Sequence, residues 1–133
     1  MESKLIKNRS KAAQLLAFDG LTYGKCKCTD IDLSMDWQGK TFVFCEIKTE
    51  GVMLTRGQQY HLEGLVKGLR KGGKEAYAIV AKHLTPAKQD VHVAQCRTHS
   101  VYNGNNWDIV DTNERLCATL DELYNEHLER QAA

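Results

Sequence analysis

The sequence predicts an α/β fold in which helices flank a mixed central β-sheet. Residues 29–48 alternate between apolar and polar side chains, as a β-hairpin with one buried face does. Residues 41–82 then pass from an apolar strand through an amphipathic helix to a second apolar strand. This crossover connection predicts that the two strands are parallel. The expected order of elements is a helix, a β-hairpin, a helix, three strands and a final helix.

Size and composition favour one folded domain that covers residues 1–133. The chain is 42% hydrophobic, which is enough for a core, and its net charge of +1 gives no overall preference for nucleic acid. Five cysteines, an odd number, and no hydrophobic secretory segment argue against a disulfide framework and favour a reducing cytoplasm. No apolar run is long enough to cross a bilayer, so we expect no membrane contact.

The first helix is predicted over about residues 3–18, and Asp19-Gly20 ends it. Its basic side chains are candidates for contact with DNA phosphates, although a solvated helix surface explains them equally well. These candidates are Lys4, Lys7, Arg9 and Lys11. A short extended piece, residues 21–27, leads into the hairpin.

The hairpin joins residues 29–36 to residues 41–48 through a turn that contains Gly39, which can take the positive φ of a tight reversal. Its apolar face and its acidic face alternate along the first strand. Ile31, Leu33 and Met35 point one way, whereas Asp30, Asp32 and Ser34 point the other.

The second helix is predicted over residues 56–70, where Thr55 and Gln58 have the spacing of a capping box. Its apolar stripe consists of Leu62, Leu65, Val66 and Leu69. Residues 71–73 end the helix, and residues 75–82 form a buried strand parallel to residues 41–48.

The last third of the chain predicts two strands and a helix. Residues 91–101 are strand-like, residues 102–106 form a turn, and residues 107–110 return as a short partner strand. Thr119 and Glu122 repeat the capping-box spacing before a helix over residues 120–130. The expected buried side chains of this helix are Leu120, Leu123, Tyr124 and Leu128.

Charged side chains of the hairpin suit metal-dependent hydrolysis of a phosphodiester. Asp30 or Asp32 on the first strand and Glu46 on the second offer the hard oxygen ligands that Mg²⁺ prefers. Lys48 shares a face with Glu46, and its ammonium can orient the attacking water and offset charge on the phosphate. Cross-strand charge pairing is the structural alternative for such a pattern.

The identity of the aspartate opposite Glu46 depends on the register of the hairpin. A three-residue turn over residues 37–39 places Asp36 opposite Lys40, and therefore Asp30 opposite Glu46. A register shifted by two residues brings Asp32 there instead, so both aspartates remain candidates.

These residues resemble the signature of the PD-(D/E)xK nuclease superfamily. The resemblance consists of the aspartate, the sequence Glu46-Ile47-Lys48 and the following helix and apolar strand, and it covers about residues 28–81. The spacing is most similar to that of small virus-type replication-repair nucleases or phage nucleases. The virus-type pattern also has a Gln at the start of the helix, here Gln58.

The resemblance implies a restriction-endonuclease-like core with Mg²⁺ or Mn²⁺ as cofactor. The implied metal ligands are Asp30, Asp32, Glu46 and Ile47, and the implied catalytic residues are Asp30, Asp32, Glu46, Lys48 and Gln58. Gln58 also has a complete structural explanation as a helix cap. Arg56, near the start of the same helix, is a further candidate for contact with DNA.

The function implied is that of a metal-dependent endodeoxyribonuclease, encoded by a phage or mobile element, in DNA processing, recombination or repair. Its partner would be DNA in the cytoplasm, that of the host cell if a phage encodes it. Cutting both strands would require a homodimer, because one small domain carries one active site. The alternative is a non-catalytic module that keeps the nuclease fold and binds DNA or a protein; the intact set of charged residues disfavours it.

Overall fold

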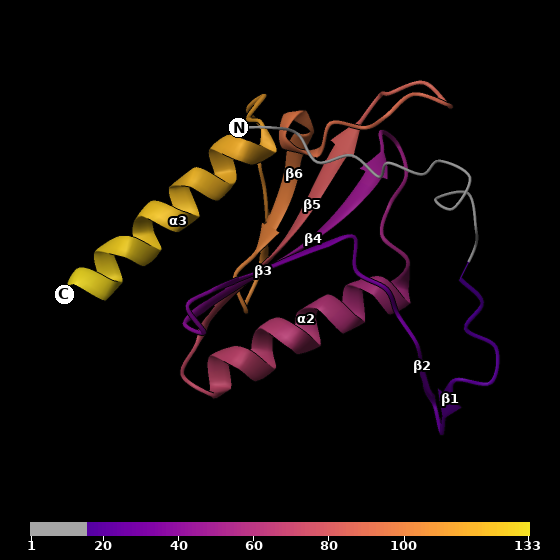
Figure 1. Cartoon of the computed structure of the whole chain (residues 1–133), viewed down its shortest axis with the longest axis horizontal. Coiled ribbons are helices and arrows are strands. Elements are labelled where there is room, and N and C mark those ends of the chain that lie inside the picture. Colours follow the sequence, from indigo (N-terminus) through magenta and orange to yellow (C-terminus); the bar gives the residue numbers. More distant parts are fainter. Residues whose placement is uncertain (1–15) are drawn as a thin grey trace.

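The computed structural model describes residues 16–133, and a five-stranded mixed β-sheet with a helix on each face is its main feature (Figure 1). The elements in chain order are β1 (Thr22–Tyr23), β2 (Cys26–Lys27), β3 (Leu33–Trp37), β4 (Thr41–Thr49), α2 (Arg56–Lys71), β5 (Glu75–His83), the 3-10 helix η1 (Val93–Gln95), β6 (Arg97–Tyr102), β7 (Trp107–Ile109) and α3 (Leu116–Ala132). The main sheet has the order β3-β4-β5-β6-β7, and β1 and β2 form a separate small sheet. The predicted mixed α/β architecture is confirmed.

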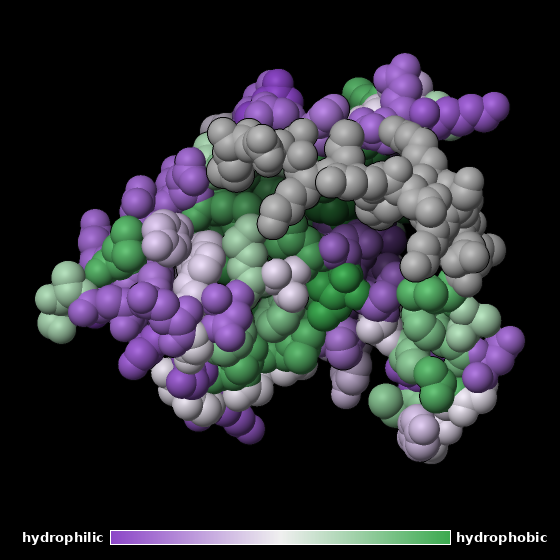
Figure 2. Space-filling model, viewed as in Figure 1, coloured by the Kyte–Doolittle hydropathy of each residue, from purple (hydrophilic) through white to green (hydrophobic). Residues whose placement is uncertain are grey.

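Two hydrophobic clusters lie on opposite faces of the main sheet. On one face, Leu116 and Leu123 of α3 pack with Val43 and Ile79 of the sheet. On the other face, α2 packs against β4, β5 and β6 through a second set of side chains, which includes Leu62, Val66, Phe44, Ala78 and Tyr102. Figure 2 shows polar side chains on the outer surface of α3 and apolar side chains between α3 and the sheet.

The strand-helix-strand connection of the chain is as predicted. Strands β4 and β5 are parallel along their whole length, with Glu46 beside Val80 and Lys48 beside Lys82. Helix α2 begins with both hydrogen bonds of a capping box. The Gln58 main-chain N–H donates to Thr55 Oγ1, and the Thr55 N–H donates to Gln58 Oε1, each at 3.1 Å.

The hairpin has the second of the two registers considered. Asp36 lies opposite Phe42 and Trp37 opposite Thr41, so the expected pairing of Asp36 with Lys40 is wrong. The reversal uses residues 38–40, because Trp37 stays in the strand, where its ring makes an edge contact with Tyr124 of α3. Gly39 has the predicted positive φ of 68°.

Helix α3 begins at Leu116, four residues before the predicted start, and the predicted cap at Thr119 is wrong. Thr119 lies inside the helix and is buried, and its hydroxyl contacts Thr98 Oγ1 at 2.6 Å and donates to Glu114 Oε2 at 2.7 Å. The buried stripe also differs from the prediction. It consists of Leu116, Thr119, Leu123 and His127, whereas Tyr124 and Leu128 are exposed.

The predicted strand over residues 91–101 is shorter than expected. Only residues 97–102 form β6, because its pairing with β5 ends where Arg97 meets Lys82. Residues 93–95 form η1 instead. The predicted turn and the short partner strand β7 are confirmed, and Asn103 Oδ1 accepts the main-chain N–H groups of Asn105 and Asn106 in this turn.

The predicted first helix falls mainly outside the described residues, and its described end, residues 16–18, is not helical. Among residues 16–133, no helix has both the length and the apolar character needed to span a membrane.

Candidate active site

The hairpin presents its charged residues on the sheet face that α2 covers. Phe42 and Phe44 of β4 pack with α2. Because side chains alternate along a strand, Glu46 and Lys48 continue the same face toward the end of β4. Helix α2 starts near that end of the parallel pair, so the charged residues lie beside its first turn rather than under its middle.

Of the predicted site residues that the structure describes, Glu46 is the most deeply buried, with 3% of its surface exposed. Burial is the main reason why its pKa is raised from the ordinary 4.5 to about 7. The charge of Asp32 and a hydrogen bond with its carboxyl raise the pKa further, while the charge of Lys48 lowers it. Glu46 and Asp32 therefore form a pair that strongly disfavours two negative charges.

Asp32 is the aspartate that the structure brings to Glu46. The β3–β4 pairing ends with Leu33 opposite Cys45, and one further step in this register leads to Asp32 and Glu46. Asp32 Oδ2 accepts the Ile47 main-chain N–H at 2.8 Å. The Asp32 carboxylate thus occupies the place on the edge of β4 where a strand partner would otherwise accept this N–H.

Asp30 and Ile47 have other positions. Asp30 is exposed, lies before the start of β3 and is not among the charges that shift the pKa of Glu46. The Ile47 side chain packs against the cluster on the α3 face. Since its N–H is bonded to Asp32, the main-chain carbonyl oxygen is the only atom through which Ile47 can bind a metal.

Gln58 and Arg56 lie in the first turn of α2. The capping box uses one lone pair of the Gln58 amide oxygen, which holds that oxygen against the Thr55 N–H. Arg56 is exposed at the first helical position. The other predicted contacts for DNA, Lys4, Lys7, Arg9 and Lys11, lie outside the described residues.

The carboxylates of Asp32 and Glu46 are the acidic ligands that the hairpin offers. In the described part of the chain, no group of three or more His, Cys, Asp or Glu side chains is close enough to hold a metal ion. The neighbouring Cys45 is buried on the opposite face, and burial raises the pKa of its thiol to about 12, so it is not a thiolate nucleophile.

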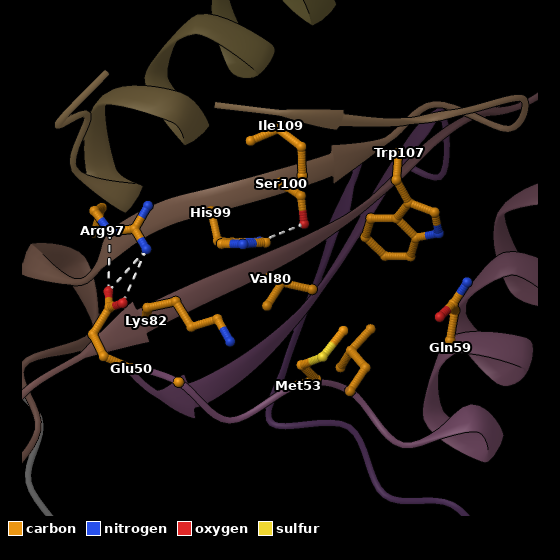
Figure 3. A pocket seen from close by; sticks show the side chains of 12 residues that line it. Glu50, Met53, Gln59, Val80, Lys82, Arg97, His99, Ser100, Trp107 and Ile109 are labelled. Atoms are coloured by element: carbon orange, nitrogen blue, oxygen red, sulfur yellow. Dashed lines mark hydrogen bonds and ion pairs between the residues drawn. The ribbon is translucent and has the colours of Figure 1, made fainter. Parts of the chain in front are cut away.

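A cavity of about 490 Å³ on the α2 face was not predicted (Figure 3). It lies one strand away from Glu46 and Lys48, because its lining includes their register partners Val80 and Lys82. One signal in the sequence pointed to it. Lys82 directly follows the apolar run of residues 76–81, and a lysine that continues a buried strand needs a polar environment.

Comparisons of the chain with protein-family models, curated proteins and solved structures find no match.

Proposed function

We propose that the protein is a metal-dependent endodeoxyribonuclease that hydrolyses DNA phosphodiester bonds with Mg²⁺ or Mn²⁺. The observation that carries the proposal is the pairing of Asp32 with the buried Glu46, with Lys48 on the same face as Glu46. The resemblance of this set to the PD-(D/E)xK superfamily supports the same chemistry. A restriction-endonuclease-like core and an origin in a phage or mobile element follow from that resemblance.

The donor set of the hairpin fits a divalent cation. Two neighbouring carboxylates repel each other when both are ionised, and the raised pKa of Glu46 reflects burial first and this repulsion second. Asp32 and Glu46 would hold the ion, with the Ile47 carbonyl oxygen as a further ligand; water and phosphate oxygens suit the remaining positions of Mg²⁺. When bound, the ion supplies charge neutralisation at the phosphate and activation of water.

Lys48 acts on the substrate rather than on the ion. It is half-buried and shares the face of Glu46, so its ammonium can offset the charge that builds on a phosphate bound at this face. Arg56 at the exposed start of α2 offers a contact to the DNA backbone, which carries no sequence information. Cleavage of both strands would need a second copy of the site, and hence a homodimer.

The decisive experiment is the incubation of supercoiled plasmid with the protein in Mg²⁺ or Mn²⁺, compared with EDTA. The variants Glu46→Gln, Lys48→Met and Asp32→Asn should each nick plasmid at least about 100-fold more slowly, the usual effect of removing one electrostatic contact to the transition state. Asp30→Asn is the matched control, because it removes the same charge from the same hairpin at an exposed position outside the pair.

Each alternative outcome has a clear meaning. Nicking that persists in EDTA, or in all three variants, contradicts the proposal. An equal loss in Asp30→Asn and Asp32→Asn contradicts the assignment of Asp32 alone. Salt-sensitive DNA binding without cleavage in either metal would instead favour the non-catalytic module.

A further inference from the structure

The cavity beside the candidate site has a polar side and an apolar side. Lys82, His99, Ser100 and Gln59 provide polar groups, and Arg97 also lines it but is held in a bidentate ion pair with Glu50. The apolar lining consists of Met53, Leu54, Val80, Trp107 and Ile109. Its volume of about 490 Å³ lies in the range of sites for small organic ligands.

A break in the strand pairing directs polar groups into this cavity. Val80 pairs with Ser100 but the next residue, Ala81, pairs with Thr98, so His99 is an extra residue in β6. Both His99 and Ser100 consequently line the cavity, where His99 Nδ1 and Ser100 Oγ lie 3.1 Å apart (Figure 3). Such bulges are enriched next to functional sites.

Trp107 is held as a fixed aromatic wall. Its indole N–H donates to Glu63 Oε2 at 2.7 Å, and the same oxygen accepts the Gln59 amide nitrogen at 2.9 Å. The indole also packs against Tyr102 with 5.1 Å between ring centroids. Because Gln59 uses its nitrogen for Glu63, its amide oxygen remains as an acceptor, and Figure 3 shows it facing the cavity.

Lys82 adds a buried positive charge to the cavity. Its side chain lies on the sheet face of Lys48, its register partner, and its ammonium donates to the Val52 carbonyl. An ammonium has three donors, so one hydrogen bond leaves capacity for an anionic ligand. The cavity thus combines a fixed aromatic face, hydrogen-bonding groups and a cation, which together match a base and the phosphate attached to it.

We propose that this cavity binds an unpaired base of the DNA strand, by stacking on Trp107, a few nucleotides from the phosphate bound at Asp32, Glu46 and Lys48. The proposal rests on the proposed nuclease function. Trp107 lies on β7, three strands from Glu46 on β4, and neighbouring strands are about 4.8 Å apart, so a base stacked on Trp107 belongs to a nucleotide a few positions along the strand from that phosphate. A base in a duplex is already paired and stacked, so the cavity selects a strand with unpaired nucleotides.

Fluorescence of Trp107 tests the proposal in EDTA, where no cleavage is expected. The chain has two tryptophans, so Trp37→Phe leaves Trp107 as the only one, on the sheet face opposite to Trp37. A single-stranded oligonucleotide should quench this fluorescence, whereas an oligonucleotide of the same length with abasic sites should not. Equal quenching by both, or tighter binding to duplex, overturns the proposal. So does tighter binding of a mononucleotide than of the oligonucleotide.

Substitution of Trp107 gives a second measurement. Trp107→Leu should weaken binding of the single strand by about 10- to 100-fold, as expected for one lost stacking contact, and leave duplex affinity unchanged. Trp107→Phe keeps an aromatic face and should retain most of the affinity. An equal loss for single strand and duplex overturns the proposal, and if Trp107→Leu fails to fold, the quenching result on the unaltered cavity decides.

The two proposals fail in distinguishable ways. Plasmid cleavage that depends on Glu46, without a base-dependent response of Trp107, overturns the base cavity and leaves the nuclease. Base-dependent quenching without cleavage in any divalent metal supports the cavity and contradicts the nuclease.

Discussion

Replacing Glu46 by Gln should stabilise the metal-free protein in neutral and alkaline solution. The pKa of Glu46 rises from 4.5 to about 7 on folding, mainly through burial, and its side chain is 3% exposed. At about 1.4 kcal/mol for each unit of pKa, the ionised carboxylate costs about 3 kcal/mol of folding free energy. A raised carboxyl pKa favours the folded state at low pH. This contribution is complete below the pKa of Glu46 in the unfolded protein, and it is lost as pH rises toward its pKa in the folded protein.

The assay is urea unfolding of the wild-type protein and of Glu46→Gln in EDTA, at about pH 5 and about pH 8. The free energy of unfolding of the wild type should fall by about 2 to 3 kcal/mol relative to the variant between these conditions. Mg²⁺ at about pH 8 should restore the wild type and have little effect on the variant, since binding to the folded state stabilises it.

Two results would refute this reasoning. If the free energies of unfolding of the two proteins differ by the same amount at both pH values, folding does not raise the pKa of Glu46. Stabilisation of both proteins alike by Mg²⁺ means that the cation binds elsewhere. Asp32→Asn refines the test. Burial is the largest cause of the Glu46 pKa shift, so most of the pH dependence of the free energy of unfolding should remain after the Asp32 charge is removed.

Two further predictions concern the helices. Gln58→Ala should lower the free energy of unfolding by about 1 kcal/mol through loss of the capping box. Gln58→Glu should preserve this free energy, because an acidic side chain suits the start of a helix whose first turn has no acidic residue. Loss of nicking in Gln58→Glu with normal stability would show a catalytic role. Thr119→Val should destabilise by about 1 to 3 kcal/mol, because the Thr98 and Glu114 side chains lose a hydrogen-bond partner. Urea unfolding measures both effects, and a neutral Thr119→Val would contradict the structural role of these bonds.

The sequence was sufficient where one local rule decides an element. The capping box of Thr55 and Gln58 set the start of α2, and the apolar run of residues 75–82 identified β5 and its parallel pairing. These signals act between neighbours in the chain or through burial on both faces of a strand, so they need no knowledge of the rest of the fold.

Prediction failed where a distant contact overrides the local rule. The spacing of Thr119 and Glu122 fits a cap, yet Thr119 is buried inside α3 because Thr98 of β6 provides a partner for its hydroxyl. His127 joins the buried stripe of this helix for the same reason. Its Nδ1 lies 2.8 Å from Thr41 Oγ1, and its Nε2 lies 3.2 Å from Gln38 Oε1. A polar residue that no local rule marks as buried is thus buried by partners far away in the sequence.

The register of the hairpin shows how the structural and the chemical role of one residue coincide. Turn chemistry at Gly39 allowed two registers, and the contact of Trp37 with Tyr124 of α3 keeps Trp37 in the strand and favours the shifted one. In that register Asp32 follows the last paired residue, and its carboxylate accepts the Ile47 N–H that no strand residue reaches. The bond fixes the Asp32 side chain beside the buried Glu46 before any ligand binds. Because an amide oxygen can accept the same N–H, Asp32→Asn should keep the hairpin intact while it removes the charge, which makes this variant a test of chemistry rather than of folding.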